Sequence, residues 1–179
     1  AAGLVFAPPG AAAPENAVYL ADSEAFGTGH HATTVLCLEA LAEIIAAGQP
    51  GSVLDVGTGS GILALAALRF GVDRATGVDI DPGALAAAAA NARLNGLELP
   101  LVRGGPEAVT GTWPLVVANV LASPLIEMAP VLVRRLGHRG RLVLSGIPNA
   151  LADEVRRAYR RLGVHWTDAR SRDGWTVLI

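Results

Sequence analysis

One glycine-rich segment constrains the fold of this chain more than any other part of its sequence. Residues 53–64 are Val-Leu-Asp-Val-Gly-Thr-Gly-Ser-Gly-Ile-Leu-Ala. This order predicts a short apolar strand, a tight turn and the first turns of a helix. Because Gly57, Gly59 and Gly61 add almost no side-chain bulk, a ligand can approach the backbone closely. The unpaired N–H groups at the start of the helix favour polar or anionic groups there.

A second apolar run ends in a carboxylate at a spacing typical of nucleoside sites. Asp79 closes the run Gly-Val-Asp and lies 18 positions after Gly61. An acidic residue at the tip of the next strand, about 20 residues on, can hydrogen-bond the hydroxyls of a ribose. Taken alone, the glycines are consistent with an ordinary turn and Asp79 with an ordinary strand end. Together they favour a cofactor that carries a nucleoside.

Strands and helices are predicted to alternate along most of the chain. The predicted fold class is α/β, with a Rossmann-like, doubly wound and mostly parallel seven-stranded sheet. The last two predicted strands resemble a hairpin, so we expect an antiparallel edge strand. The predicted strands are 52–56, 75–79, 99–102, 115–120, 141–145, 164–169 and 175–179, with a turn at 171–174, and the predicted helices are 34–47, 60–70, 82–95, 124–136 and 150–162.

Length and composition are consistent with one domain that has a full core. The chain has 179 residues, of which 51% are hydrophobic, and a net charge of -2 that gives no reason to expect a nucleic-acid partner. No apolar run reaches the ~18 residues of a membrane span, and the first ten residues lack the basic region of a signal peptide, so a cytoplasmic location is expected. We expect a leader or linker with two short strands over residues 1–24, and the domain over residues 25–179.

Several other kinds of site are not favoured. His30 and His31 precede a helix, but no further His, Cys, Asp or Glu stands at ligand spacing, so no metal is expected. Cys37, the single cysteine, lies in a helical pattern and is expected to be buried. There is no Gly-x-Ser-x-Gly elbow and no Walker lysine. The third glycine stands one place early for a dinucleotide fingerprint.

The pattern Asp-x-Gly-x-Gly-x-Gly at 55–61 resembles motif I of S-adenosylmethionine-dependent methyltransferases. A narrower resemblance, to the ribosomal protein L11 methyltransferase family, runs from about residue 18 to the end. The segment Ala-Phe-Gly-Thr-Gly-His-His-Ala-Thr-Thr at 25–34 is its specific part, because many methyltransferases share motif I. The other segments that match the family are 54–64, 77–82, 91–96, 117–122, 144–147 and 174–178.

The resemblance implies a cofactor site for S-adenosylmethionine, which leaves as S-adenosylhomocysteine. The glycine loop would receive the methionine moiety and Asp79 would hold the ribose hydroxyls. Asn119, at the polar end of an apolar strand, would be the catalytic residue that helps to place the incoming amine. Residues 26–31 would cover the site. The implied site residues are Phe26, Gly27, Thr28, Thr34, Asp55, Gly57, Gly59, Gly61, Asp79, Ile80 and Asn119.

The resemblance also implies the reaction and its partner. Enzymes of the family methylate lysine side chains and the α-amine of ribosomal protein L11, which they grip with an added N-terminal domain. The Ala/Pro-rich start of this chain is not expected to be such a domain. The chain is then either part of a longer enzyme or a short homologue with another substrate. We expect direct displacement at the sulfonium methyl, driven mainly by proximity and alignment, with His30 or His31 as a hypothetical proton acceptor.

Three alternatives stay open at this point. A methyltransferase with the same catalytic domain could act on a different protein or on a small molecule. A non-catalytic cofactor-binding module is the second, and a nicotinamide oxidoreductase the third, although the chain contains no lysine for a Tyr-x-x-x-Lys site. A helix face with four arginines, at 156, 157, 160 and 161, is more consistent with a solvated surface than with a site for RNA or an acidic protein.

Overall fold

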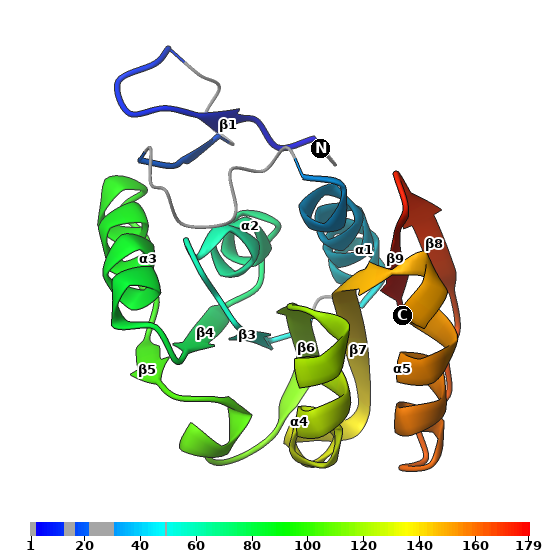
Figure 1. The fold of residues 1–179 in the computed structure, drawn as a ribbon. Coiled ribbons are helices and arrows are strands. Elements are labelled where there is room, and N and C mark those ends of the chain that lie inside the picture. The colour runs from blue at the N-terminus through cyan, green and yellow to red at the C-terminus, as the bar shows by residue number, and fades with distance from the viewer. Residues whose placement is uncertain (1–2, 13–16, 22–30, 49) are drawn as a thin grey trace.

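The central feature of the fold, in the computed structural model, is a seven-stranded sheet. The structure describes residues 3–12, 17–21, 31–48 and 50–179. The strands of this sheet are β3 (Ser52–Val56), β4 (Arg74–Asp79), β5 (Leu101–Arg103), β6 (Trp113–Asn119), β7 (Leu136–Pro148), β8 (Ala169–Arg172) and β9 (Trp175–Leu178). Their order across the sheet is β5-β4-β3-β6-β7-β9-β8 (Figure 1).

The direction of the strands confirms the predicted fold class. β3 to β7 pair in parallel, whereas β9 is antiparallel to both β7 and β8 at one side of the sheet. Within this sheet the chain first forms β3 in the middle and then β4 and β5 toward one side. It returns to form β6 on the other side of β3. In such sheets ligands bind outside the carboxyl ends of the strands at the point where the winding reverses. That point lies between β3 and β6.

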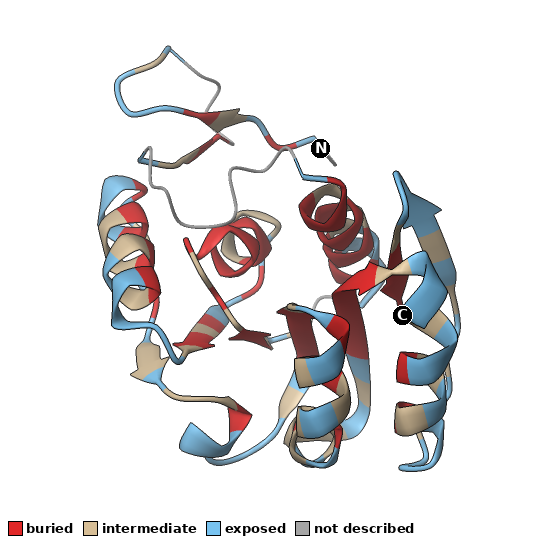
Figure 2. Ribbon diagram, viewed as in Figure 1, coloured by how far each residue is buried: buried red, intermediate tan, exposed pale blue. Residues whose placement is uncertain are grey.

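Helices cover both faces of the sheet, and each layer encloses its own apolar core. α1 (Ala32–Gly48), α2 (Ile62–Arg69) and α3 (Pro82–Leu94) lie on one face, and α4 (Ala122–Arg135) and α5 (Ala152–Arg160) on the other (Figure 1). Alternate residues of β6 divide between the layers, because successive side chains of a strand point to opposite faces. Leu115 and Val117 join the first core, Val116 and Ala118 the second. Figure 2 shows the central strands and the inner helix faces as buried, whereas the outer strands β5 and β8 are partly exposed.

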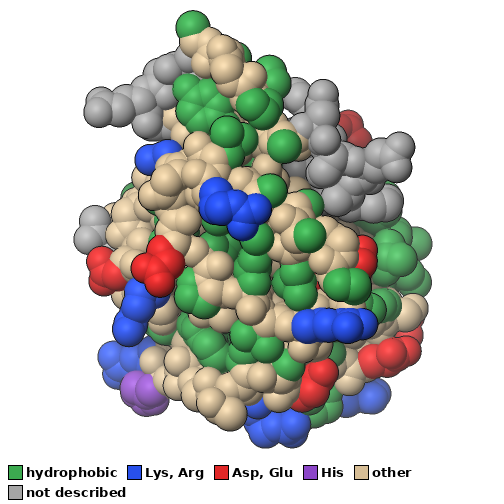
Figure 3. Space-filling model, turned by 90° about the vertical axis from the view of Figure 1, so that its left-hand side faces the viewer, with side chains coloured by type: hydrophobic (Ala, Val, Ile, Leu, Met, Phe, Trp, Pro, Cys, Tyr) green, Lys and Arg blue, Asp and Glu red, His purple; other side chains and the backbone are tan. Residues whose placement is uncertain are grey.

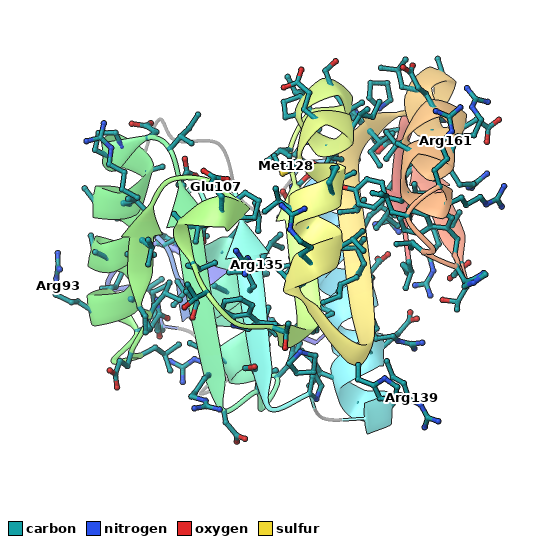
Figure 4. All side chains as sticks on the ribbon, turned by 90° about the horizontal axis from the view of Figure 1, so that it is seen from below. Arg93, Glu107, Met128, Arg135, Arg139 and Arg161 are labelled. Carbon is teal, nitrogen blue, oxygen red and sulfur yellow. The ribbon has the colours of Figure 1, made fainter. Side chains whose placement is uncertain are left out.

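Local sequence explains the ends of several elements. Asp81 caps α3 as expected, since its side chain accepts a hydrogen bond from the Gly83 N–H at 2.8 Å and Pro82 follows it. A short helix, η1 (Pro106–Ala108), is fastened to α4 by Arg135, whose Nε donates to the Pro106 carbonyl at 2.9 Å (Figure 4). Another short helix, η2 (Asn149–Leu151), leads into α5.

The structure corrects the predicted strand at 164–169. Only Ala169 belongs to a strand, and β8 continues to Arg172, so the turn is Asp173-Gly174 rather than 171–174. Both turn residues have positive φ, 50° and 83°, as a type I′ hairpin turn requires. The alternation of Val164 and Trp166 has another cause: both pack on the second core.

Two short strands near the N-terminus are present close to where the sequence predicts them. β1 (Phe6–Ala7) and β2 (Val18–Tyr19) pair in parallel. Leu4 and Val18 belong to the first core, so this segment packs on the domain that follows it. The predicted boundary between residues 24 and 25 lies outside the described residues and stays a prediction. Within the described part of the chain, no helix is long and apolar enough to cross a membrane.

A buried hydroxyl between α4 and α5 gives a test of the second core. Tyr159 is fully buried, its hydroxyl donates to the Leu125 carbonyl at 2.8 Å, and its ring contacts Trp166 edge-on. Tyr159→Phe keeps the ring but removes this buried hydrogen bond between the two helices. We expect the free energy of unfolding, measured with urea, to fall by about 1–2 kcal/mol.

Tyr19→Phe is the matched control, because the hydroxyl of this other tyrosine makes no hydrogen bond to a described residue. Equal urea midpoints for Tyr159→Phe and the wild type would contradict the assignment.

Candidate functional site

The polar ends of three neighbouring strands lie together. β3 sits between β4 and β6, and all three strands run in the same direction. Asp55 of β3 is level with Gly77 on one side and Val117 on the other. The glycine loop after β3, Asp79 at the end of β4 and Asn119 at the end of β6 therefore share one edge of the sheet.

The loop between β3 and α2 adopts backbone angles that require glycine. Gly57, Gly59 and Gly61 have φ values of 71°, 54° and 81°. A Cβ at position 57 would overlap Cγ1 of Val120, and one at position 61 would lie 3.2 Å from the Cβ of Ala88. The N–H groups of Gly57 and Thr58 both donate to the Val78 carbonyl. The loop is thus a narrow backbone turn held against the end of β4.

The Asp55 side chain lies beneath this loop. Its Oδ2 accepts hydrogen bonds from Thr58 Oγ1 at 2.8 Å and from the Ala64 N–H at 3.2 Å, and the residue is 0% exposed. Gly61, at the start of α2, has no side chain for capping, so Asp55 takes this role from the neighbouring strand. Its Oδ1 has no hydrogen-bond partner among the described residues. Asp55 would therefore affect a ligand indirectly, by holding the loop in its conformation.

Burial changes the acidity of Asp55. It raises the pKa of this carboxyl from 3.8 to about 6, and the hydrogen bonds from Thr58 and Ala64 offset only part of the shift. The nearby carboxylate of Asp79 contributes a smaller part of this rise in the pKa of Asp55. Asp55 is a charged group at neutral pH in a place that favours the neutral form.

The Asp79 carboxylate is fixed at the mouth of the loop. Its Oδ2 accepts from the Gly59 N–H at 2.9 Å, and its Oδ1 accepts from the Asp81 N–H at 3.0 Å. Each carboxylate oxygen can accept a second hydrogen bond, so two neighbouring hydroxyls of a ligand could bind here. Ile80, the next residue, is 75% exposed and offers an apolar surface beside the carboxylate. These features fit a nucleoside.

Asn119 meets the first turn of α1. Its Nδ2 donates to Oγ1 of Thr34 at 3.4 Å, and Thr34 is buried. The chain after Asn119 also lies against β7: Gly146 has a φ of 81°, and a Cβ there would overlap the carbonyl of Val120. Thr34 and Asn119, separated by 85 positions in sequence, thus lie in contact.

His31 immediately precedes α1 and acts as its cap. Its Nδ1 accepts from the Thr33 N–H at 3.4 Å and lies 2.8 Å from Thr33 Oγ1, while the ring packs edge-on against Trp175 at 5.2 Å. Both Thr33 groups can donate to Nδ1, so the neutral ring that satisfies them carries its proton on Nε2. This geometry favours a structural cap over the hypothetical proton acceptor.

Four of the predicted site residues cannot be located. Phe26, Gly27, Thr28 and His30 lie outside the described residues. Within the described ranges, no group of three or more His, Cys, Asp or Glu could hold a metal ion. Cys37 is buried, and burial raises the pKa of its thiol.

Asn91 of α3, which has no predicted role in the sequence, contacts the glycine loop. Its side chain bonds to the carbonyl of Ser60 in the glycine loop at 2.9 Å. The only signal was its place in the matching segment 91–96, which gives no role to the amide.

Comparison with known proteins decides the family. A family model described as ribosomal protein L11 methyltransferase (PrmA) matches residues 8–179. A ribosomal protein L11 methyltransferase of Nitrosomonas europaea is 47% identical over 86% of this chain, and one of Geobacter sulfurreducens is 46% identical over 87%. The chain belongs to the ribosomal protein L11 methyltransferase family.

Structural similarity agrees with this membership. A ribosomal protein L11 methylase from Lactobacillus delbrueckii subsp. bulgaricus has a TM-score of 0.88 and 30% identity, with 98% of this chain and 92% of that chain covered. A precorrin 8w decarboxylase from Methanobacterium thermoautotrophicum, at a TM-score of 0.63 and 23% identity, shares the fold. The chain spans about half the length of the two L11 methyltransferase relatives, 52% and 51%.

The acidity of Asp55 predicts a pH-dependent stability. Between pH 3.8 and about 6 the folded chain keeps a proton on Asp55 that the unfolded chain has lost, so stability falls as the pH rises through this window. Asp55→Asn keeps an oxygen acceptor but cannot ionise. We expect the wild type to lose up to about 3 kcal/mol relative to this variant between pH 4 and pH 7.

Urea unfolding of both proteins at each pH measures this difference. Because carboxyl groups remote from Asp55 titrate equally in the two proteins, the difference reports Asp55 together with its interaction with Asp79. A difference that does not change with pH would rule out a raised pKa for Asp55.

Proposed function

We propose that this chain is the catalytic part of an S-adenosylmethionine-dependent protein methyltransferase that acts on amino groups of ribosomal protein L11. The observation that carries the proposal is the meeting of the glycine loop, Asp79 and the Thr34–Asn119 pair at one edge of the sheet. Membership of the L11 methyltransferase family supports the substrate.

The described residues fit the proposed cofactor in two respects. Three glycines within residues 57–61 leave the backbone of the loop without side chains at these positions, so the amino-acid end of a ligand can approach it closely. Asp79, already held by two N–H groups, would accept hydrogen bonds from the two ribose hydroxyls. The predicted cofactor residues of this part are Thr34, Asp55, Gly57, Gly59, Gly61, Asp79, Ile80 and Asn119, with Asp55 acting from beneath the loop.

Asn119 would position the methyl acceptor. Bound S-adenosylmethionine supplies an electrophilic methyl group on a sulfonium. The Asn119 amide uses its donor nitrogen on Thr34, so its carbonyl oxygen is the atom left to accept a hydrogen bond from an amine. That bond would direct the nitrogen lone pair at the methyl carbon. One N–C bond forms, one S–C bond breaks, and the amine releases one proton for each methyl group transferred.

We also propose a partner and a cellular location for this methyltransferase. The expected partner is ribosomal protein L11, and a ribosomal substrate places the enzyme in the cytoplasm. No nucleic-acid partner is expected, since the net charge is -2. Figure 3 shows acidic and basic side chains mixed over the face that carries α3 rather than one basic surface.

Binding of S-adenosylhomocysteine, followed by titration calorimetry, tests the cofactor. The wild type should bind it and should not bind NAD. Asp79→Ala should weaken binding about 10- to 100-fold, the effect of losing hydrogen bonds to a charged group.

Asp81→Ala is the control for this experiment. Asp81 lies two residues further on and caps α3, but the N–H that it gives to Asp79 belongs to the backbone. Its replacement should lower stability by about 1 kcal/mol and leave the affinity unchanged. Equal affinities of Asp79→Ala and the wild type would remove Asp79 from the site.

Methyl transfer to L11, followed by mass spectrometry, tests the reaction. Asn119→Ala should slow transfer about 100-fold because the amine loses its alignment, while cofactor binding falls much less. Methylation of other amines but not of L11 would disprove the substrate. Cofactor binding without transfer to any amine would favour a non-catalytic module.

A further inference from the structure

Asn91 of α3 and Asn95, the C-cap residue of this helix, both bond to the segment 17–21. Asn91 is 1% exposed; its Nδ2 donates to the Ser60 carbonyl at 2.9 Å and its Oδ1 accepts from the Ala21 N–H at 2.9 Å. Asn95, one turn later, accepts from the Tyr19 N–H at 2.8 Å and donates to the Tyr19 carbonyl at 2.7 Å.

The two side chains differ in what they join. Asn95 connects α3 to the segment 17–21 and, through its own carbonyl, to Arg69 of α2 at 3.0 Å. Asn91 connects the same segment to the glycine loop. Among the described residues of these elements, the Asn91 side chain is the one that hydrogen-bonds to both the segment 17–21 and the glycine loop.

We propose that Asn91 is a positioning residue for the cofactor loop. It holds the Ser60 carbonyl against α3 and is itself fixed by the N–H of Ala21. The inference rests on the proposed function, because it assigns Asn91 to the same cofactor site.

The position of Ser60 explains why this bond matters. Ser60 lies between Gly59, whose N–H binds Asp79, and Gly61, which opens α2. Three residues with positive φ within five positions allow the loop many conformations when it is unrestrained. Asp55 restrains the loop from below through Thr58, and Asn91 restrains its other side through Ser60. Without Asn91 the Gly59 N–H and the Asp79 carboxylate would no longer keep their mutual position.

The test compares Asn91→Ala with Asn95→Ala. Both variants remove buried amides that bind the segment 17–21, so both should be less stable than the wild type. Only Asn91→Ala releases the loop. We expect its Kd for S-adenosylhomocysteine to rise about tenfold, whereas Asn95→Ala stays within about twofold, both measured by calorimetry well below the melting temperatures.

Asn91→Asp separates the effects of the two hydrogen bonds that the Asn91 side chain makes. The carboxylate can still accept from the Ala21 N–H but, when ionised, cannot donate to the Ser60 carbonyl. At pH 8 the Kd should stay as high as in Asn91→Ala. A Kd restored to the wild-type value would mean that Asn91 only anchors the segment 17–21, and would overturn the inference.

A second measurement does not depend on the cofactor. The backbone amide NMR signals of Gly59 and Gly61 in the free protein should shift in Asn91→Ala and not in Asn95→Ala. Unchanged signals together with an unchanged Kd in Asn91→Ala would overturn the inference while leaving the proposed function intact. Absence of binding by the wild type would overturn the proposed function, and the inference with it.

Discussion

The hydrogen bonds that the buried Asp55 carboxylate accepts are the interaction on which the site depends. They come from Thr58 in the glycine loop and Ala64 in the first turn of α2, so one side chain joins strand, loop and helix. Gly61, the N-cap residue of α2, has no side chain with which to cap this helix. Capping from β3 solves this, but it places a carboxylate where burial raises its pKa to about 6. The position of Asp55 is therefore explained by the shape of the loop and not by stability.

The sequence was sufficient to predict the fold class and to bring the polar strand ends to one side of the sheet. An unbroken apolar strand such as 115–120 is typical of a strand covered on both faces, and β6 divides its side chains between two cores as that prediction requires. Once parallel strands are placed side by side, their last residues must share one edge. The convergence of Asp79 and Asn119 with the glycine loop follows from this geometry alone, before any relative is known.

The sequence was insufficient where contacts connect distant residues. The motif around Asp55 does not tell whether the carboxylate faces a ligand or lies under the loop, because both positions suit the same pattern. The bond between Asn91 and Ala21 joins residues 70 positions apart and leaves no local trace. The predicted strand at 164–169 failed for a related reason: the alternation around Trp166 matches a strand, but its indole N–H donates to the Arg156 carbonyl of α5.

Val120 packs between Gly57 of the glycine loop and Gly146 of β7. On one side, a Cβ at Gly57 in the loop would overlap its side chain, and on the other, a Cβ at Gly146 in β7 would overlap its carbonyl. The residue directly after Asn119 is thus enclosed between two glycines at positive φ. This packing sets the distance between the loop, where the cofactor is proposed to bind, and the amide that would align the amine. In-line displacement depends on such alignment more than on acid–base groups, and among the described residues of the proposed site close backbone packing would supply it.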